Sequence, residues 1–219
     1  MEEESTTNSS AADRKDEEES LVVCRDEGRL RISYLTFYTP DEADELKDAL
    51  LVETEFKTVK GRFGSKSFTF PRKIAAYGDA YTTYEFSGAC VRASPWTPLS
   101  KRIKRRVEAF TKCSFNFVLL NLYRDGKDEI GAHKDDETSM SKYAPIASLS
   151  FGASRKMVFR KGKFKEKVFE LELKHGSLCV MWYPTNRHYY HEIGKQLDVL
   201  KPRLNLTFRK LNPACNYRL

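Results

Sequence analysis

The hydrophobic and polar positions of the chain predict helices in its first half and β-strands in its second half. From residue 115 to residue 123 the side chains alternate with a period of two, as expected of a strand. Further short strands are predicted at 146–151, 157–160, 168–173, 178–182 and 203–209. Many short strands with turns between them are typical of a sandwich or a barrel, and a jelly roll suits their number.

A first helix is predicted to begin at Thr39. This residue suits the N-cap, Pro40 suits the first helical position, and Glu42 completes a capping box. Hydrophobic residues at helical spacing then predict the buried face, which comprises Ala43, Leu46, Ala49 and Leu50.

A hairpin tip is predicted at residues 60–66, which are rich in Gly, Ser and Lys. Phe63 is a large aromatic residue in this otherwise polar loop. Its ring is expected either to pack under the loop or to stand exposed as a wedge.

A second helix is predicted from Thr97 and Pro98, and its hydrophobic positions are Leu99, Ile103, Val107 and Phe110. The opposite face carries a basic run, which consists of Lys101, Arg102, Lys104, Arg105 and Arg106. Such a run is typical of a nuclear localisation signal, a phosphate-contacting patch or simply the solvated face of an amphipathic helix.

The charge of the chain is unevenly distributed. Residues 1–20 carry eight acidic and two basic side chains and are expected to be a disordered acidic tail. The net charge of the whole chain is +7, which leaves +13 for residues 21–219. A body this basic favours a polyanionic partner, with nucleic acid as the first candidate, although a lysine-rich solvated surface is an alternative.

The five cysteines are scattered and none is in a Cys-x-x-Cys motif, so we expect neither a disulfide framework nor a zinc ribbon. This pattern fits the cytosol or nucleus. No hydrophobic run approaches the roughly 18 residues of a membrane span. The acidic N-terminus resembles neither a secretory signal nor a transit peptide, so we expect no membrane association.

Candidate metal chemistry is concentrated around His133 and Asp135. These residues are two positions apart, so in an extended segment both side chains leave the same face. Two histidines and one carboxylate on one face of an octahedron are the ligands of non-haem Fe(II) oxygenases, and they leave three positions open. A lone His-x-Asp is common by chance, so this motif needs support from the rest of the chain.

The predicted strand 203–209 places four polar residues on one face, namely Arg203, Asn205, Thr207 and Arg209. On an exposed sheet this face would be ordinary. Inside a barrel the two arginines would be costly unless an anion met them. A dicarboxylate would do so, because guanidinium and carboxylate groups pair through two parallel hydrogen bonds.

Together these motifs resemble the AlkB family of Fe(II) and 2-oxoglutarate-dependent dioxygenases, over roughly residues 30 to 211. The resemblance rests on Asn121-x-Tyr123, His133-x-Asp135, His191, Arg203-x-Asn205-x-x-x-Arg209 and the segment 145–153. Three further segments, 71–73, 77–80 and 84–88, are similar to the eukaryotic branch that repairs duplex DNA.

The resemblance implies a mainly β fold with flanking helices, an α+β chain with a double-stranded β-helix core. Residues 114–219 would form this dioxygenase core, and residues 21–113 an N-terminal extension with helices and nucleotide-recognition hairpins in the same compact domain. His133, Asp135 and His191 would be the catalytic Fe(II) ligands. His191 is preferred over His188, three residues earlier, and His175 is expected to be structural.

The cosubstrate 2-oxoglutarate would be held by Asn121, Tyr123, Arg203, Asn205 and Arg209, with Arg203 at its distal carboxylate. With O2 it would be converted to succinate and CO2, while an N-methyl group is hydroxylated and lost as formaldehyde. The cofactor carries this chemistry and the protein positions it.

The implied substrate is 1-methyladenine or 3-methylcytosine in DNA, and a base in a duplex must be flipped out to be reached. The substrate-binding residues would be Phe63, Arg72, Tyr84, Phe86, Asp136 and Glu137. Phe86 would stack on the base opposite His133, and the acidic pair would accept hydrogen bonds from its exocyclic amine. A nuclear monomer acting on methylated DNA is expected, with duplex favoured and single strands possible.

Two departures from the family pattern bear on duplex recognition. Phe63 is one residue out of register with the family's wedge position, and the segment 194–198 contains one lysine where the family has a basic cluster. Two alternatives therefore stay open: an oxygenase acting on RNA or single-stranded DNA, and a catalytically silent nucleic-acid-binding protein.

Overall fold

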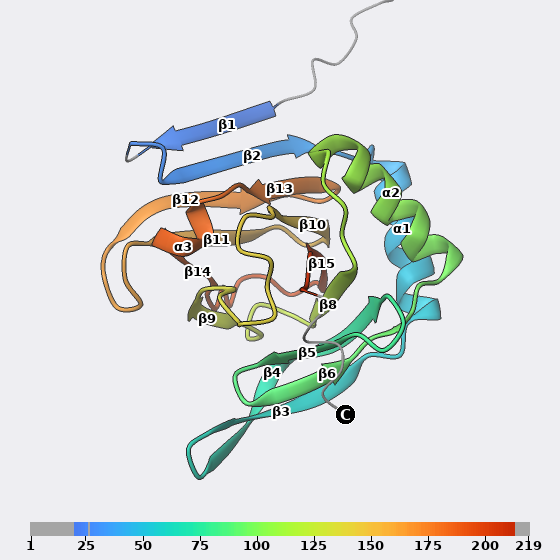
Figure 1. Cartoon of the computed structure of the whole chain (residues 1–219). Helices are drawn as coiled ribbons and strands as arrows, with labels where there is room; N and C mark the ends of the chain where they lie inside the picture. Colours follow the sequence, from blue (N-terminus) through green and yellow to red (C-terminus); the bar gives the residue numbers. More distant parts are fainter. Residues whose placement is uncertain (1–19, 26, 213–219) are drawn as a thin grey trace, which may run out of the picture.

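The computed structural model describes residues 20–25 and 27–212 of the chain, so the predicted acidic tail lies almost entirely outside the described residues. Two β-sheets face each other, two helices flank the larger sheet, and two hairpins project beyond it (Figure 1). The predicted mainly β fold with flanking helices is therefore confirmed.

The larger sheet has nine strands and is mostly antiparallel, with the short β7 (Ser94–Pro95) pairing parallel to β4. The other strands follow in the spatial order β1 (Ser20–Arg25), β2 (Leu30–Thr36), β13 (Ser177–Met181), β10 (Ile146–Gly152), β15 (Arg203–Arg209), β8 (Phe117–Tyr123), β4 (Lys66–Gly78) and β3 (Lys57–Phe63).

The smaller sheet has four strands, in the order β12 (Lys167–Leu173), β11 (Arg155–Arg160), β14 (Tyr190–Ile193) and β9 (Ile130–His133). Between β13 and β14 lies the short helix α3 (Thr185–His188). Hydrophobic residues from both sheets, including Ile146, Met157, Phe159 and Met181, pack together in the space between them.

Helices α1 (Pro40–Glu53) and α2 (Pro98–Thr111) pack on the outer face of the larger sheet (Figure 1). Both begin as predicted, because Thr39 and Thr97 each cap the helix with a complete capping box. Their buried residues join those of the sheet in one core. Two predictions for the buried faces were wrong: Ala49 is exposed, and Phe110 is 39% exposed where α2 reaches the rim of this core.

The basic run of α2 is helical, as the amphipathic interpretation predicts. Arg106 differs from its neighbours, since its guanidinium lies 4.2 Å from the centroid of the Tyr38 ring and donates a 2.7 Å hydrogen bond to the carbonyl of Phe37. This residue therefore ties α2 to the start of α1. No helix among the described residues is long and apolar enough to cross a membrane.

Strand β15 is buried on both faces, and its sequence alternates because one face meets the hydrophobic core and the other a polar layer. Leu204, Leu206 and Phe208 pack in the core under the helices. The polar residues face the space between the sheets, where Asn205 pairs in register with Asn121 of β8 and Ser150 of β10. Polar side chains from three adjacent strands thus meet in one layer.

Two hairpins pack against each other: β3–β4, at the edge of the larger sheet, and β5–β6 (Thr83–Phe86 and Ala89–Arg92), which forms a sheet of its own (Figure 1). The backbone amide of Arg62 donates a 3.1 Å hydrogen bond to the carbonyl of Ser87. Gly88 has a φ of +69°, and a Cβ atom there would lie 2.4 Å from the carbonyl oxygen of Arg62. Only glycine allows so close a contact between the hairpins.

Candidate active site

Three candidate metal ligands meet between the two sheets. His133 ends β9 and His191 lies on β14, where the two residues are paired directly across the sheet. Their ring centroids are 4.3 Å apart. With Asp135 they form a cluster whose possible ligand atoms all lie within 4.8 Å of one another.

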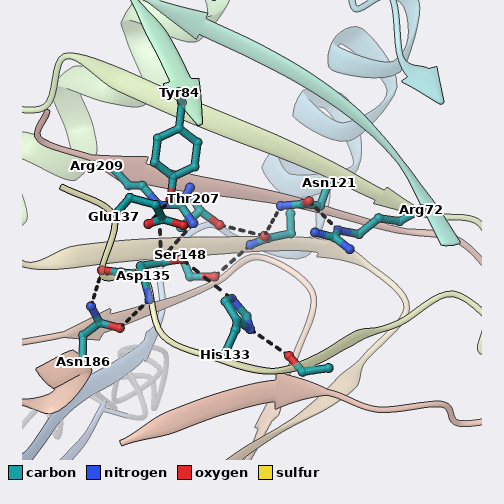
Figure 2. Close-up of polar contacts among 12 residues, drawn as sticks. Arg72, Tyr84, Asn121, His133, Asp135, Glu137, Ser148, Asn186, Thr207 and Arg209 are labelled. Carbon is teal, nitrogen blue, oxygen red and sulfur yellow. Dashed lines mark hydrogen bonds and ion pairs between the residues drawn. The ribbon is translucent and has the colours of Figure 1, made fainter. Parts of the chain in front are cut away.

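Neighbouring groups fix the orientation of His133 and Asp135 (Figure 2), whereas Nδ1 of His191 has no hydrogen-bond partner among the described residues. Nδ1 of His133 lies 2.9 Å from the carbonyl oxygen of Gly131, which makes Nδ1 the protonated nitrogen and leaves Nε2 as the ligand atom. The side chain of Asn186 accepts a 3.0 Å hydrogen bond from the backbone amide of Asp135. Arg209 donates to the carboxylate of Asp135 from Nη2 at 2.8 Å.

The electrostatics of the cluster suit a divalent cation. Burial lowers the pKa of His191 to about 3 and also lowers the pKa of His133, so both imidazoles are neutral at pH 7. Burial alone would raise the pKa of Asp135, but Arg209 and the two histidines hold it at about 2. Two neutral imidazoles and one carboxylate are the donor set that non-haem Fe(II) sites use.

A row of hydrogen-bonded amides and hydroxyls lies beside the metal ligands (Figure 2). Oδ1 of Asn205 accepts a 2.9 Å hydrogen bond from Thr207 and a 3.4 Å one from Nδ2 of Asn121. Its Nδ2 donates to Oγ of Ser148 at 2.8 Å. At the outer end of the row, Nε of Arg72 donates to Oδ1 of Asn121 at 2.8 Å. These contacts hold the polar groups of four strands, β4, β8, β10 and β15, in fixed positions.

Arg203 is buried in this region with unused hydrogen-bonding capacity. Its Nη2 donates to Oγ of Ser150 at 2.9 Å, whereas Nε and Nη1 have no partner. Burial lowers the pKa of this guanidinium to about 10, so the group is still charged at pH 7. A buried cation with two unpaired donors is costly to the free protein and is suited to bind an anion such as a carboxylate.

The two arginines of β15 therefore have different environments. Arg209 has a protein carboxylate as its partner, because both Nε and Nη2 donate to Oδ2 of Asp135. Its remaining Nη1 has no partner. Arg203 has no acidic partner at hydrogen-bond distance among the described residues. Both arginines were expected to need an anion inside the barrel. For Arg209 this anion is the carboxylate of Asp135, whereas Arg203 is left to bind one from outside the protein.

One cavity of about 360 Å³ contains both the candidate metal ligands and the polar row. On one side aromatic rings line it: Tyr84 and Phe86 stack with centroids 5.3 Å apart. The hydroxyl of Tyr84 donates a 2.7 Å hydrogen bond to Oε2 of Glu137. Burial raises the pKa of Glu137, and the charge of Asp135 adds to that effect. Four of the residues predicted to contact the substrate line this cavity, namely Arg72, Tyr84, Phe86 and Glu137.

Other predicted residues lie elsewhere. Asp136 is exposed and lines a neighbouring cavity of about 330 Å³ on the other side of the segment 134–137. Phe63 ends β3 at the hairpin tip, and its side chain lies outside the described part of the structure. His188 is exposed at the end of α3, and Nδ1 of His175 accepts a hydrogen bond from the backbone amide of Gly152.

Two residues of the site and one buried arginine behind it were missed by sequence reasoning. Ser148 and Ser150 are the inward-facing hydroxyls of β10, and their spacing of two is a signal that could have identified them. Arg155 is 1% exposed and lies against Tyr123, and it donates hydrogen bonds to the carbonyls of Asp125, Asp128 and Gly194. No local motif marks Arg155, because its partners are distant in the sequence.

A family model described as the 2OG-Fe(II) oxygenase superfamily matches residues 32–209 of the chain. The chain is 45% identical over 197 residues to a human protein named DNA oxidative demethylase ALKBH2, covering 85% of this chain and 75% of that protein. It is 44% identical over 200 residues to the bovine protein of that name, with 87% and 72% covered.

The chain belongs to the AlkB family of 2OG-Fe(II) oxygenases. A human protein named alpha-ketoglutarate-dependent dioxygenase alkB homolog 3 is 34% identical over 190 residues, covering 82% of this chain and 65% of that protein. The solved structure entitled "The structure of OsALKBH1" is similar with a TM-score of 0.56 at 21% identity, over 82% of this chain and 97% of that one. This likeness confirms the jelly-roll core.

Family membership makes the protein a dioxygenase that uses Fe(II), 2-oxoglutarate and O2. The residues fit these groups, since the His-Asp-His cluster has the right donors and Arg203 keeps two unpaired N–H groups for a carboxylate. A silent protein would have no need for this buried, costly set, so the family and the site both oppose that alternative.

Proposed function

We propose that the protein is a DNA repair enzyme that removes N-methyl groups from 1-methyladenine and 3-methylcytosine. The observation that carries the proposal is one cavity in which a His-Asp-His cluster lies beside a wall of stacked aromatic rings. The cluster is suited to oxidation and the rings are suited to a flat base. Oxidative demethylation of DNA is the activity named for the relatives that are 44–45% identical.

In this proposal His133, Asp135 and His191 are the catalytic ligands of Fe(II). Iron, 2-oxoglutarate and O2 together supply the oxidation that hydroxylates the N-methyl carbon, after which formaldehyde leaves. The two histidines stay neutral and Asp135 stays ionised, so the set carries one negative charge toward the cation. Arg209 binds Oδ2 of Asp135, which orients the carboxylate and leaves Oδ1 for the metal.

The 2-oxoglutarate would lie along the polar row. Arg203, whose Nε and Nη1 have no protein partner in the described part of the chain, would donate from this unused capacity to the distal carboxylate. Tyr123, whose ring lies 5.2 Å from the guanidinium carbon of Arg203, positions that cation. The remaining contacts of the cosubstrate come from Asn121, Asn205 and Arg209. Arg72 then acts on the cosubstrate through Asn121, which it fixes by a 2.8 Å hydrogen bond.

The flipped base would enter between the aromatic wall and the metal ligands. Phe86 and His133 both line the cavity, which supports a base stacked between them. Glu137 is held by Tyr84 and offers its carboxylate to the exocyclic amine of the base. Asp136 lies outside this cavity, so any contact it makes would be with the flanking nucleotides.

Residues 21–113 would act as the nucleotide-recognition extension, because both projecting hairpins belong to it and Phe68, Phe70 and Phe86 of these hairpins line the cavity. Duplex DNA is favoured as the substrate, with Phe63 filling the gap that the flipped base leaves. A basic turn beside the cavity supports the choice of duplex DNA. The turn between β11 and β12 carries several lysines, and one of them, Lys163, lines the cavity.

We further propose a nuclear monomer. The scattered cysteines fit a reducing compartment, and the three thiols described as free, Cys90, Cys113 and Cys179, agree with that. The net charge of +13 on residues 21–219 attracts the protein to a polyanion, and nuclear DNA is such a polyanion.

A second candidate function is the same reaction on single-stranded DNA or RNA. The segment after the distal histidine favours it, since Lys195 is the one basic residue of 194–198 and its Nζ lies 3.7 Å from a carboxylate oxygen of Glu129. Leu197 and Leu200 next to it are 69% and 82% exposed, so this loop offers little charge to a complementary strand.

Rates of demethylation on matched oligonucleotides test the proposal. The same sequence with one 1-methyladenine is supplied as duplex DNA, single-stranded DNA and single-stranded RNA, and the repaired base is measured by mass spectrometry. The proposal predicts repair of both DNA forms and a higher kcat/KM on the duplex. A higher value on RNA, or on the single strand alone, would favour the second candidate.

A further inference from the structure

Phe68 stands at the outer edge of the active-site cavity, apart from the residues proposed to hold the methylated base and the cosubstrate. It lies on β4 and is 41% exposed, although it is one of the residues that line the cavity. An aromatic ring that is part wall and part solvent-exposed is suited to contact a ligand that extends out of the cavity.

Phe68 is the outermost ring of an aromatic series that leads inward. Its centroid is 5.2 Å from that of Phe70 in an edge-to-face contact. Phe70 lies 5.4 Å from Phe86, and Phe86 lies 5.3 Å from Tyr84. Phe86 and Tyr84 line the part of the cavity proposed to hold the flipped base. Phe68 is therefore placed two rings further out along the same wall.

The backbone of the neighbouring strand supports the inner side of this ring. Gly61 of β3 is the cross-strand partner of Phe68, and a Cβ atom at Gly61 would lie 2.5 Å from Cζ of the ring. Only glycine leaves room for the ring in this position. Phe68 is thus held against β3 and Phe70, and the exposed part of the ring is on the side away from them.

Positive charge lies next to this ring. Side chains alternate along β4, so Lys66 projects from the same face as Phe68, Phe70 and Arg72. Lys66 is exposed. An aromatic surface beside lysine or arginine is the combination that binds single nucleic-acid strands, by stacking on the base and pairing with the phosphate.

We propose that Phe68 and Lys66 form a second nucleotide subsite, in which Phe68 stacks on the base next to the methylated one and Lys66 contacts the phosphate between them. The inference rests on the proposed function, because it takes the inner part of the cavity as the site of the methylated base. Stacking is tolerant of sequence, since every base has an aromatic face, so this subsite adds affinity without selecting a neighbouring base.

The alternative is that Phe68 only covers Gly61. Phe68→Leu separates the two roles, because leucine keeps hydrophobic cover over Gly61 but has no ring to stack on a base. Phe68→Trp keeps and enlarges the stacking surface. Phe110→Ala is the matched control, since Phe110 is similarly exposed but lies on α2, outside the cavity.

The decisive experiment compares a methylated mononucleotide with a methylated trinucleotide. Phe68→Leu is expected to raise KM for the trinucleotide about tenfold, which is within the range found for removing one base–aromatic stack, and to leave kcat unchanged. In Phe68→Leu, KM for the mononucleotide and Tm should match wild type. Phe110→Ala should have the wild-type KM for both substrates. Phe68→Trp should bind the trinucleotide at least as well as wild type. Equal losses on both substrates, or no loss on the trinucleotide, would overturn the proposal.

The Kd of the trinucleotide, measured without 2-oxoglutarate so that no turnover occurs, separates this inference from the proposed function. A wild type that binds the trinucleotide but never demethylates it would contradict the function, and the ratio of Kd values for wild type and Phe68→Leu would still decide the role of Phe68. A wild type that demethylates the trinucleotide and a Phe68→Leu variant with the same Kd would contradict only the subsite.

Discussion

Arg209 donates two hydrogen bonds to a single carboxylate oxygen, Oδ2 of Asp135, from Nε at 3.1 Å and from Nη2 at 2.8 Å. The other oxygen, Oδ1, lies 3.7 Å from Nε2 of His133, on the side of the metal ligands. Asp135 therefore presents one oxygen to a cation and has the other fixed by the protein. Outer partners of this kind orient metal ligands and tune their affinity.

Arg209→Met is expected to weaken metal binding by about 10- to 100-fold, the usual cost of losing such an outer partner. The measurement is calorimetric titration of the apo-protein with Mn(II), without 2-oxoglutarate. Arg203→Met is the matched control, because Arg203 lies on the same face of β15 and makes no contact with the metal ligands among its assigned hydrogen bonds. Equal metal affinity of Arg209→Met and wild type would contradict the role given to this pair.

Arg203→Ala is expected to raise KM for 2-oxoglutarate steeply. Loss of a buried charge-assisted pair costs about 2–5 kcal/mol, or roughly 30-fold to several thousand-fold in affinity. Arg203→Lys should recover only part of this loss, because an ammonium group does not reproduce the paired donors of guanidinium. Steady-state kinetics with varied 2-oxoglutarate provide the measurement, and an unchanged KM in Arg203→Ala would refute the assignment.

Phe63→Ala is expected to slow repair of a methylated duplex by about tenfold or more, which corresponds to roughly 1.4 kcal/mol. Filling the gap left by a flipped base recovers part of the stacking and pairing energy, and a single strand has no such gap. Repair of the same lesion in a single strand should therefore barely change. If Phe63 instead packs under its own loop, Tm falls and the losses on both substrates are equal.

Arg155 connects the loop that follows β8 to the loop that follows β14. Arg155→Met leaves the carbonyl groups of Asp125, Asp128 and Gly194 without this partner. Breaking such a buried network is expected to cost about 3–5 kcal/mol, which lowers Tm by roughly 6–20 °C in a domain of this size. Arg160→Met on the same strand is the control. Its ion pair with Glu192 is more exposed, so its loss should cost about 1 kcal/mol or less. Thermal melts in which Arg155→Met is no less stable than Arg160→Met would contradict this role.

Much of the fold could be predicted from local patterns. The capping box at Thr39 and the pair Thr97-Pro98 marked both helix starts, and the alternation of strand 203–209 marked one polar and one apolar face. Such signals work because they depend on residues close together in the sequence. Ala49 was misplaced for the complementary reason, since which side of a helix is buried depends on the sheet beneath it.

The candidate site was less predictable where its contacts are long-range. Arg72 follows a proline on a strand, and nothing nearby in the sequence shows that its guanidinium turns inward to Asn121, which is 49 positions away. The division of roles between Arg203 and Arg209 likewise depends on Asp135, which approaches only one of them. The motif identified both arginines, but only the folded chain distinguishes them.

The most direct test of Fe(II)- and 2-oxoglutarate-dependent DNA demethylation is the stoichiometry of a single reaction. Repaired base, formaldehyde and succinate are measured together, with a duplex containing 1-methyladenine as the substrate. We expect equal amounts of all three products in wild type and in His188→Ala, and none in His191→Ala or without 2-oxoglutarate. Repair that continues in His191→Ala, or that proceeds without succinate, would contradict this mechanism.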